Sequence, residues 1–258
     1  IKIDAIKTSL QRGQIPIGEI RLGIYGNEDP MYILAGLPFI APDYSSAWLL
    51  KDVQMGYLQD KFAKKGLMIL YTSPWPGQGF YTKSPVNSVA DFKGKKLRIY
   101  STATQQMGSM LGFNATILPF AEIPQAFSTG LIEALFTSPQ TGIDIQAWDN
   151  TKHFTYAGAI FSKNAVVVSK KAFNALSKDD QSNMLAAAKS AELRGWEMSA
   201  ETTKKQIDIL KKNGMSAKNA PDEVISKMKS IGLEMMKSWR SKASPEANAV
   251  LDRYLSMR

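Results

Sequence analysis

Residues 95–139 have the sequence KKLRIYSTATQQMGSMLGFNATILPFAEIPQAFSTGLIEALFTSP. Within this stretch the apolar spacing changes repeatedly between a strand period of about 2 and a helix period of about 3.6. Strands that alternate with helices are typical of an α/β fold with a largely parallel sheet. The predicted elements are strands at 97–100, 116–118 and 132–136 and helices at 102–111 and 121–129.

The same alternation extends toward the N-terminus. Apolar residues alternate with polar or small ones over residues 20–24, which predicts a strand. Asp43 is placed to cap a helix that ends at Gly66, and the apolar run at 67–71 is typical of a buried strand. The N-terminal part therefore continues the α/β pattern.

Beyond Ser169 the sequence is almost entirely helical. Ser177 is suited to an N-cap, and a helical pattern runs from about residue 178 to 213. Its apolar stripe is incomplete, so we expect this long helix to lie across more than one body of the protein. A last helical region covers residues 222–257.

The sequence Trp75-Pro76-Gly77-Gln78-Gly79 interrupts the pattern and is typical of a crossover loop. It predicts a boundary between two lobes. Lobe I is expected to comprise residues 1–74 and 163–258, including the long helix, and lobe II residues 75–162.

The composition is that of an ordinary globular protein. The 258 residues include 44% hydrophobic and 21% charged residues and no cysteine, which excludes collagen-like, disordered and disulfide-stapled classes. No apolar run approaches the roughly 18 residues of a membrane span. The chain starts at Ile1 without a leader sequence, so we expect that a signal peptide has been removed or that the N-terminus has been trimmed.

The formal net charge of +9 suggests an acidic partner, but its distribution does not. Residues 163–258 carry 18 basic and 11 acidic residues, and the lysines recur between apolar helix positions as on a solvated helix face. No nucleic-acid-binding module accompanies the charge, so no nucleic-acid partner is predicted.

Signals for catalysis are poor. His153 is the only histidine, there is no cysteine, and neither a nucleophile elbow nor a phosphate-binding glycine loop is present. The acidic residues are scattered singly, so no metal site is predicted. The sequence thus favours a protein that is not an enzyme, with no catalytic residue and no cofactor.

Arg98 is the most informative polar residue. Alternation in its strand places it opposite Leu97 and Ile99, near the carboxyl end, where open α/β sheets bind ligands. A guanidinium can hold a carboxylate with two parallel hydrogen bonds. From the residues alone a surface arginine is an equally good interpretation, but aromatic residues in the surrounding loops favour a pocket. They are Trp75, Tyr81, Tyr100, Phe120, Phe136 and Trp148.

Nearly the whole chain resembles the solute-binding proteins of tripartite ATP-independent periplasmic (TRAP) transporters, the DctP family. The stretches that carry the resemblance are Asp91-Phe92-Lys93-Gly94-Lys95-Lys96-Leu97-Arg98 and Leu118-Pro119-Phe120-Ala121-Glu122-Ile123-Pro124-Gln125-Ala126-Phe127-Ser128-Thr129-Gly130-Leu131-Ile132-Glu133-Ala134. Shorter matches are Gln11-Arg12-Gly13-Gln14-Ile15, Leu37-Pro38-Phe39, Lys64-Lys65-Gly66, the strand Ala165–Ser169 and Lys171-Ala172-Phe173, and the long helix fits as well. The order and spacing of these short matches make the resemblance specific.

The resemblance implies a two-lobed periplasmic-binding-protein-like fold that closes over an organic acid in the periplasm and delivers it to TRAP membrane subunits. It implies that Arg98 clamps the ligand carboxylate and that Phe120 lines the pocket. We also expect a monomer, although no sequence feature fixes the oligomeric state. The predicted ligand-binding residues are Arg98, Gln78, Phe120, Thr137, Ser138, Ser101, Asn164, Trp75 and Tyr100.

The sequence departs from the family pattern at three places. Gln78 stands where many members have a second arginine, and Glu133-Ala134-Leu135-Phe136-Thr137-Ser138-Pro139 replaces a segment with an amide contact. Both changes favour a less polar ligand. The family's first strand–helix unit has no counterpart before Ile1, so we expect it to be missing from this chain.

Together these observations predict a binding protein for a small monocarboxylate, with aromatic, α-keto or α-hydroxy acids favoured. Three alternatives stay open at this point. One is a homologue that senses the acid for a receptor, another is an enzyme on the same two-lobed scaffold, and the third is a basic nucleic-acid-binding protein.

Overall fold

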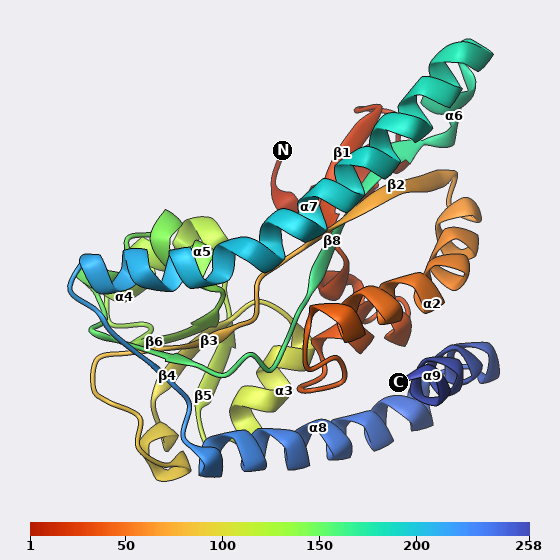
Figure 1. Ribbon diagram of the computed structural model, residues 1–258. Helices are drawn as coiled ribbons and strands as arrows, with labels where there is room; N and C mark the ends of the chain where they lie inside the picture. Colours follow the sequence, from red (N-terminus) through yellow and green to blue (C-terminus); the bar gives the residue numbers. More distant parts are fainter.

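The computed structural model describes residues 1–258 and contains two β-sheets, each the centre of one lobe (Figure 1). The smaller sheet has the order β1-β8-β2, with β8 antiparallel to both neighbours. Its strands are β1 (Ile17–Arg21), β2 (Leu67–Pro74) and β8 (Lys163–Ser169). Strand β8 therefore comes back from the larger lobe to the middle of the smaller sheet.

The larger sheet has six strands in the order β5-β4-β6-β3-β7-β9. Strands β5, β4 and β6 are parallel, β3 is antiparallel to β6 and β7, and β9 is parallel to β7. The strands are β3 (Gly79–Thr82), β4 (Lys96–Ile99), β5 (Asn114–Ile117), β6 (Ala134–Thr137), β7 (His153–Tyr156) and β9 (Ser216–Asn219).

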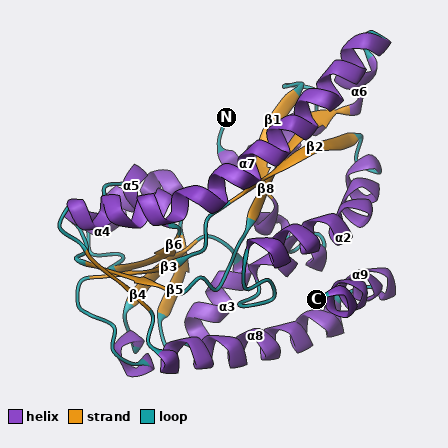
Figure 2. Cartoon of the chain, in the orientation of Figure 1, coloured by secondary structure: helices purple, strands orange, loops and turns teal.

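Helices cover the outside of both sheets (Figure 2). The helices are α1 (Ile6–Gln11), α2 (Tyr44–Ala63), α3 (Thr102–Met110), α4 (Ile123–Ser128), α5 (Pro139–Asp144), α6 (Lys170–Asn174), α7 (Lys178–Lys212), α8 (Asp222–Lys242) and α9 (Pro245–Met257). Helix α7 has 35 residues and is therefore about 50 Å long. It packs on β2 of the smaller sheet and on α5 and β9 of the larger lobe, so it spans both lobes.

Side-chain caps fix where several of these helices begin. The Asp43 carboxylate accepts a hydrogen bond from the Ser46 amide at 2.7 Å, and the Ser177 hydroxyl accepts one from the Asp180 amide at 3.1 Å. Gly66, three residues beyond the end of α2, has a φ of +71°, a conformation that favours glycine. These caps supply partners for backbone groups that a helix end leaves unpaired.

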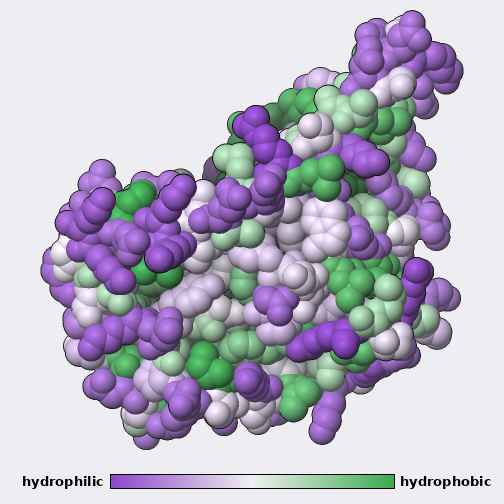
Figure 3. Space-filling model, in the orientation of Figure 1, coloured by the Kyte–Doolittle hydropathy of each residue, from purple (hydrophilic) through white to green (hydrophobic).

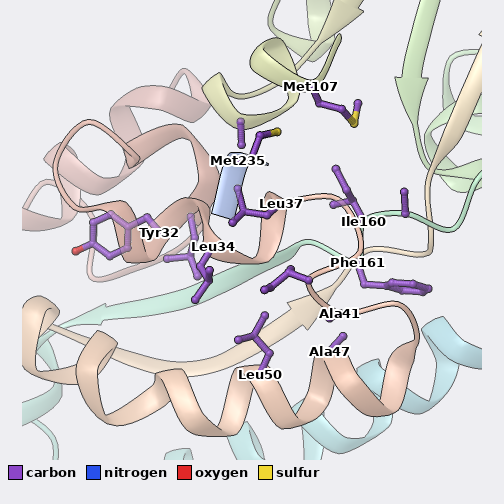
Figure 4. Packing of buried hydrophobic residues seen from close by; sticks show 14 of the residues in the cluster. Tyr32, Leu34, Leu37, Ala41, Ala47, Leu50, Met107, Ile160, Phe161 and Met235 are labelled. Carbon is purple, nitrogen blue, oxygen red and sulfur yellow. The ribbon is translucent and has the colours of Figure 1, made fainter. Parts of the chain in front are cut away.

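The main hydrophobic core contains 43 buried residues and continues from one lobe into the other. Figure 4 shows Leu34 and Leu37 between Leu50 of α2 and Met235 of α8. A second cluster of ten buried residues includes Tyr81 of β3, Phe154 of β7 and Leu210 of α7. The Tyr81 hydroxyl donates to the Ser138 carbonyl at 3.0 Å and so fixes the turn at the end of β6.

Hydrophilic side chains gather over the projecting start of α7, whereas the surface between the lobes is paler (Figure 3). None of the helices combines the length and the hydropathy that a bilayer crossing requires.

Most sequence-predicted elements are confirmed, including the long helix and the crossover loop after residue 74. The strand expected over 20–24 is wrong beyond Arg21, because the chain turns there into a 3₁₀ helix (Leu22–Tyr25). The last helical region is broken at Ser244, which caps α9. The lobe boundaries stay a prediction, and β9 joins the larger sheet although it follows residue 163.

Candidate functional site

A cavity of about 430 Å³ lies between the two lobes. This volume is in the range of small-molecule sites. Strand β1 and the start of β8 supply one wall, and β4, the end of β6 and the loop before β3 supply the other. The lining residues are Ile3, Ile6, Glu19, Arg21, Gly23, Ile24, Trp75, Gln78, Arg98, Tyr100, Phe120, Thr137, Ser138, Thr141, Asp144, Ser162, Lys163 and Asn164.

Arg98 lies on β4, between β5 and β6, with 2% of its surface exposed. Its Nε donates to the Leu118 carbonyl at 3.0 Å, and its guanidinium carbon lies 6.0 Å from the centre of the Tyr100 ring. No carboxylate forms an ion pair with it. A buried cation that faces a cavity without a counterion is suited to an anionic ligand.

The charge on Arg98 persists despite this burial. Desolvation, together with the like charge of Arg21, lowers the pKa of Arg98 to about 10. The guanidinium therefore stays protonated at neutral pH. Its desolvation cost is present in the empty protein, and a bound carboxylate would offset it.

Gln78 joins three segments that line the cavity. Its Oε1 accepts from the Tyr100 hydroxyl at 2.6 Å, and its Nε2 donates to the Ser162 hydroxyl at 3.2 Å. Burial raises the pKa of Tyr100 to about 12, so the phenol is neutral and remains a donor. The crossover loop, β4 and the start of β8 are thus held at a fixed spacing.

Asn164 links the two walls of the cavity. Its Oδ1 accepts from the Trp75 Nε1 at 3.1 Å, and its Nδ2 donates to the Glu19 carboxylate at 2.8 Å. Trp75 belongs to the crossover loop, whereas Glu19 belongs to β1. Asn164 therefore orients an indole and a carboxylate at the same site.

The end of β6 supplies two buried hydroxyl residues. Ser138 caps α5 by accepting a hydrogen bond from the Thr141 amide at 3.1 Å, and Thr137 precedes it in the strand. Phe120 differs from both because it is 40% exposed, at the start of the segment before α4. It offers a free aromatic face to a ligand in the cavity.

The cavity brings together eight of the nine sequence-predicted ligand residues: Arg98, Gln78, Phe120, Thr137, Ser138, Asn164, Trp75 and Tyr100. The ninth, Ser101, does not line it. The Ser101 hydroxyl caps α3 at the Thr104 amide, 3.2 Å away, and borders a neighbouring cavity of about 30 Å³. A helix-capping requirement thus accounts for this serine.

Four charged lining residues were not predicted: Glu19, Arg21, Asp144 and Lys163. Glu19 and Arg21 lie on the face of β1 opposite the buried Ile20, so the strand alternation contained a signal for them. Lys163 is buried, and its ammonium donates to the Gln54 Oε1 at 2.6 Å. Burial, with the like charge of Lys51, lowers the pKa of Lys163 to about 7.

The remaining chemistry of the chain lies elsewhere. His153 pairs with Thr82 and Ser216 within the larger sheet and does not line the cavity. No group of three or more histidine, cysteine, aspartate or glutamate side chains is arranged to hold a metal ion.

Comparison with known proteins identifies the family. Residues 4–242 match the model of bacterial extracellular solute-binding protein, family 7 (DctP). The chain belongs to the DctP family. Its two-lobed α/β fold with a long helix across both lobes is the fold of the solved TRAP solute-binding proteins, as the sequence resemblance predicted.

Two solved DctP relatives are similar over almost the whole chain. DctP7 of Bordetella pertussis, an extracytoplasmic solute receptor binding pyroglutamic acid, is 37% identical to this chain with a TM-score of 0.96. The alignment covers 98% of this chain and 84% of the DctP7 chain. A marine-metagenome TRAP solute-binding protein specific for pyroglutamate is 34% identical to this chain with a TM-score of 0.94. That alignment covers 99% of this chain and 84% of the metagenome protein.

Among curated DctP relatives, a solute-binding protein of Chromohalobacter salexigens is 25% identical over 213 residues. The match covers 79% of this chain but 62% of that relative, so the chain spans less than two thirds of its length.

Proposed function

We propose that this DctP chain is the ligand-binding part of a periplasmic receptor for a small monocarboxylate. The observation that carries the proposal is Arg98, a protonated and buried guanidinium that faces an interlobe cavity without a carboxylate partner. The ligand carboxylate serves as the counterion of Arg98, and its two oxygens can accept two parallel hydrogen bonds from the guanidinium. In this proposal the loaded monomer delivers its ligand to TRAP membrane subunits.

The cavity walls narrow the class of acid. Trp75, Tyr100 and Phe120 supply aromatic surface, and Thr137 and Glu19 supply hydrogen-bonding groups. Such walls suit an aromatic, α-keto or α-hydroxy acid of modest size. They also suit pyroglutamate, a cyclic monocarboxylate with a lactam, which is the ligand named for the two similar solved proteins. Pyroglutamate is therefore the first acid to test.

The test is a set of calorimetric titrations of the purified chain. The panel contains pyroglutamate, lactate, pyruvate, mandelate, benzoylformate, benzoate and, as a dicarboxylate, succinate. We expect at least one monocarboxylate to bind, and Arg98→Ala to weaken that binding by about 100-fold or more, because removal of one partner of a buried ion pair costs about 3–5 kcal/mol.

Arg12→Ala is the matched control, since Arg12 is an exposed arginine outside the cavity. Its affinity should equal that of the wild type. Binding of no monocarboxylate, or equal affinity in Arg98→Ala, would refute the proposed anchor.

A further inference from the structure

Arg21 faces the same cavity as Arg98 but belongs to the other lobe. It is the last residue of β1 in the smaller sheet, whereas Arg98 lies on β4 of the larger sheet. The two side chains are close enough for the charge of Arg21 to lower the pKa of Arg98. Two guanidinium groups from opposite lobes thus point at one space.

The hydrogen-bonding capacity of Arg21 is largely unused. Its Nε is buried without a partner, although a buried donor is normally satisfied. Its one carboxylate contact is Asp4, 3.5 Å from Nη2, and the Asp4 side chain is 66% exposed. An exposed ion pair of this kind contributes little to stability and is easily exchanged for another anion.

The backbone that carries Arg21 is held firmly. Arg21 pairs with Asn164 of β8, and Glu19, two residues earlier on the same strand face, accepts the hydrogen bond from the Asn164 side chain. The guanidinium therefore projects from a fixed strand into the cavity. This is the placement that a ligand-binding group requires.

We propose that Arg21 is a second anchor for the ligand carboxylate, which it binds from the smaller lobe while Arg98 binds it from the larger one. This inference rests on the proposed function. Glu19 and Asp144 line the same cavity, and they disfavour a second negative group on the ligand, whereas the remaining lining cation, Lys163, already donates to the Gln54 side chain. The two arginines therefore share one carboxylate, and the preferred ligand is a monoanion.

The pair also links binding to closure. In the empty protein two like charges face each other across the cleft, and their repulsion opposes the approach of the lobes. A carboxylate between them turns this repulsion into attraction on both sides. The anion is then the bridge that holds the lobes together.

The experiment compares Arg21→Gln, Arg21→Lys and wild type, with pyroglutamate and its uncharged primary amide as probes in calorimetric titrations. We expect Arg21→Gln to weaken pyroglutamate binding by at least tenfold and to leave the weak binding of the amide nearly unchanged. Arg21→Lys should recover part of the affinity, because it restores the charge without the fork. Small-angle scattering should show less ligand-induced compaction for Arg21→Gln than for wild type.

Arg12→Gln is the control, and thermal unfolding without ligand verifies that each variant is folded. If pyroglutamate binds wild type and Arg21→Gln equally while Arg98→Ala loses it, the second anchor is refuted and the proposed function stands. An equal loss for acid and amide would show a merely structural role and would also refute it. If wild type binds no monocarboxylate, both proposals fail.

Discussion

Two buried cations in this protein have opposite surroundings. Lys7 on α1 is 3% exposed, and its ammonium is hydrogen-bonded to the Glu28 carboxylate and lies 4.1 Å from the centre of the Tyr25 ring. Arg98 is 2% exposed, donates one hydrogen bond to a backbone carbonyl and forms no ion pair with a carboxylate. Lys7 has its counterion within the protein, whereas the counterion of Arg98 has to come from a bound ligand. A buried charge therefore indicates function only when its partner is missing.

The largest effect expected from this contrast is on stability at Lys7. Lys7→Met leaves Glu28 with Lys65 as its remaining cation and should lower the free energy of unfolding by about 2 kcal/mol. The loss is smaller than for a fully buried pair because Glu28 is partly exposed, and because burial, which lowers the pKa of Lys7, offsets part of the attraction between the two groups. Urea unfolding measures this loss. Ligand affinity should not change, because Lys7 does not line the cavity. Unaltered stability would mean that the ion pair contributes nothing.

At Lys163 we expect an effect of intermediate size on the stability of the protein, and this effect depends on pH. Its pKa is about 7 in the folded protein and near 10.5 in the unfolded chain, so between these values the unfolded chain binds more protons. This residue therefore makes the protein more stable as pH rises from 7 to 10, and its full penalty is present below pH 7. Lys51 and Glu192 are the charged groups that act on it, with opposite signs.

Lys163→Met should consequently raise the midpoint of thermal unfolding, relative to wild type, more at pH 6 than at pH 9. The exposed Lys170→Met is the control at the other end of β8. The same difference from wild type at both pH values would show that the Lys163 ammonium carries no burial penalty.

The smallest effect is expected at Arg98 in the absence of ligand. Arg98→Met removes an unpaired buried charge together with one hydrogen bond to a carbonyl, so the free energy of unfolding should change by less than about 1 kcal/mol. Urea unfolding of the empty protein measures it beside Lys7→Met. If Arg98→Met lowered the free energy of unfolding as much as Lys7→Met does, the proposed difference between a paired and an unpaired buried cation would be wrong.

Local signals explain what the sequence could predict. Asp43 and Ser177 cap helices through contacts with residues three positions away, and such patterns are visible in any single sequence. Arg98 was found because alternation within one strand fixes the face of each side chain. In contrast, β9 has a polar sequence, Ser216-Ala217-Lys218-Asn219, without a strand pattern, and it becomes a strand only beside β7.

The second arginine was missed for a related reason. Its role depends on β1 lying beside β8, far along the chain, and on the cavity that this pairing places opposite β4. The sequence pattern predicts a strand that continues through residue 24, and the family resemblance places a second arginine at position 78, where this chain has glutamine. A sequence specifies such long-range neighbours through the packing of the whole core, which no local pattern reveals.

Strand β9 has a consequence for shortened forms of the protein. It returns from the end of α7 to cover the outer side of β7, and its Ser216, Lys218 and Asn219 are exposed. A chain that stopped within α7 would leave the backbone N–H and C=O groups of β7 open, and an uncovered edge of this kind recruits strands from other molecules. Fragments cut before residue 216 should therefore aggregate and should not fold into a functional protein. In the full chain the polar strand β9, with the charged Lys218, disfavours pairing of this sheet edge with other molecules.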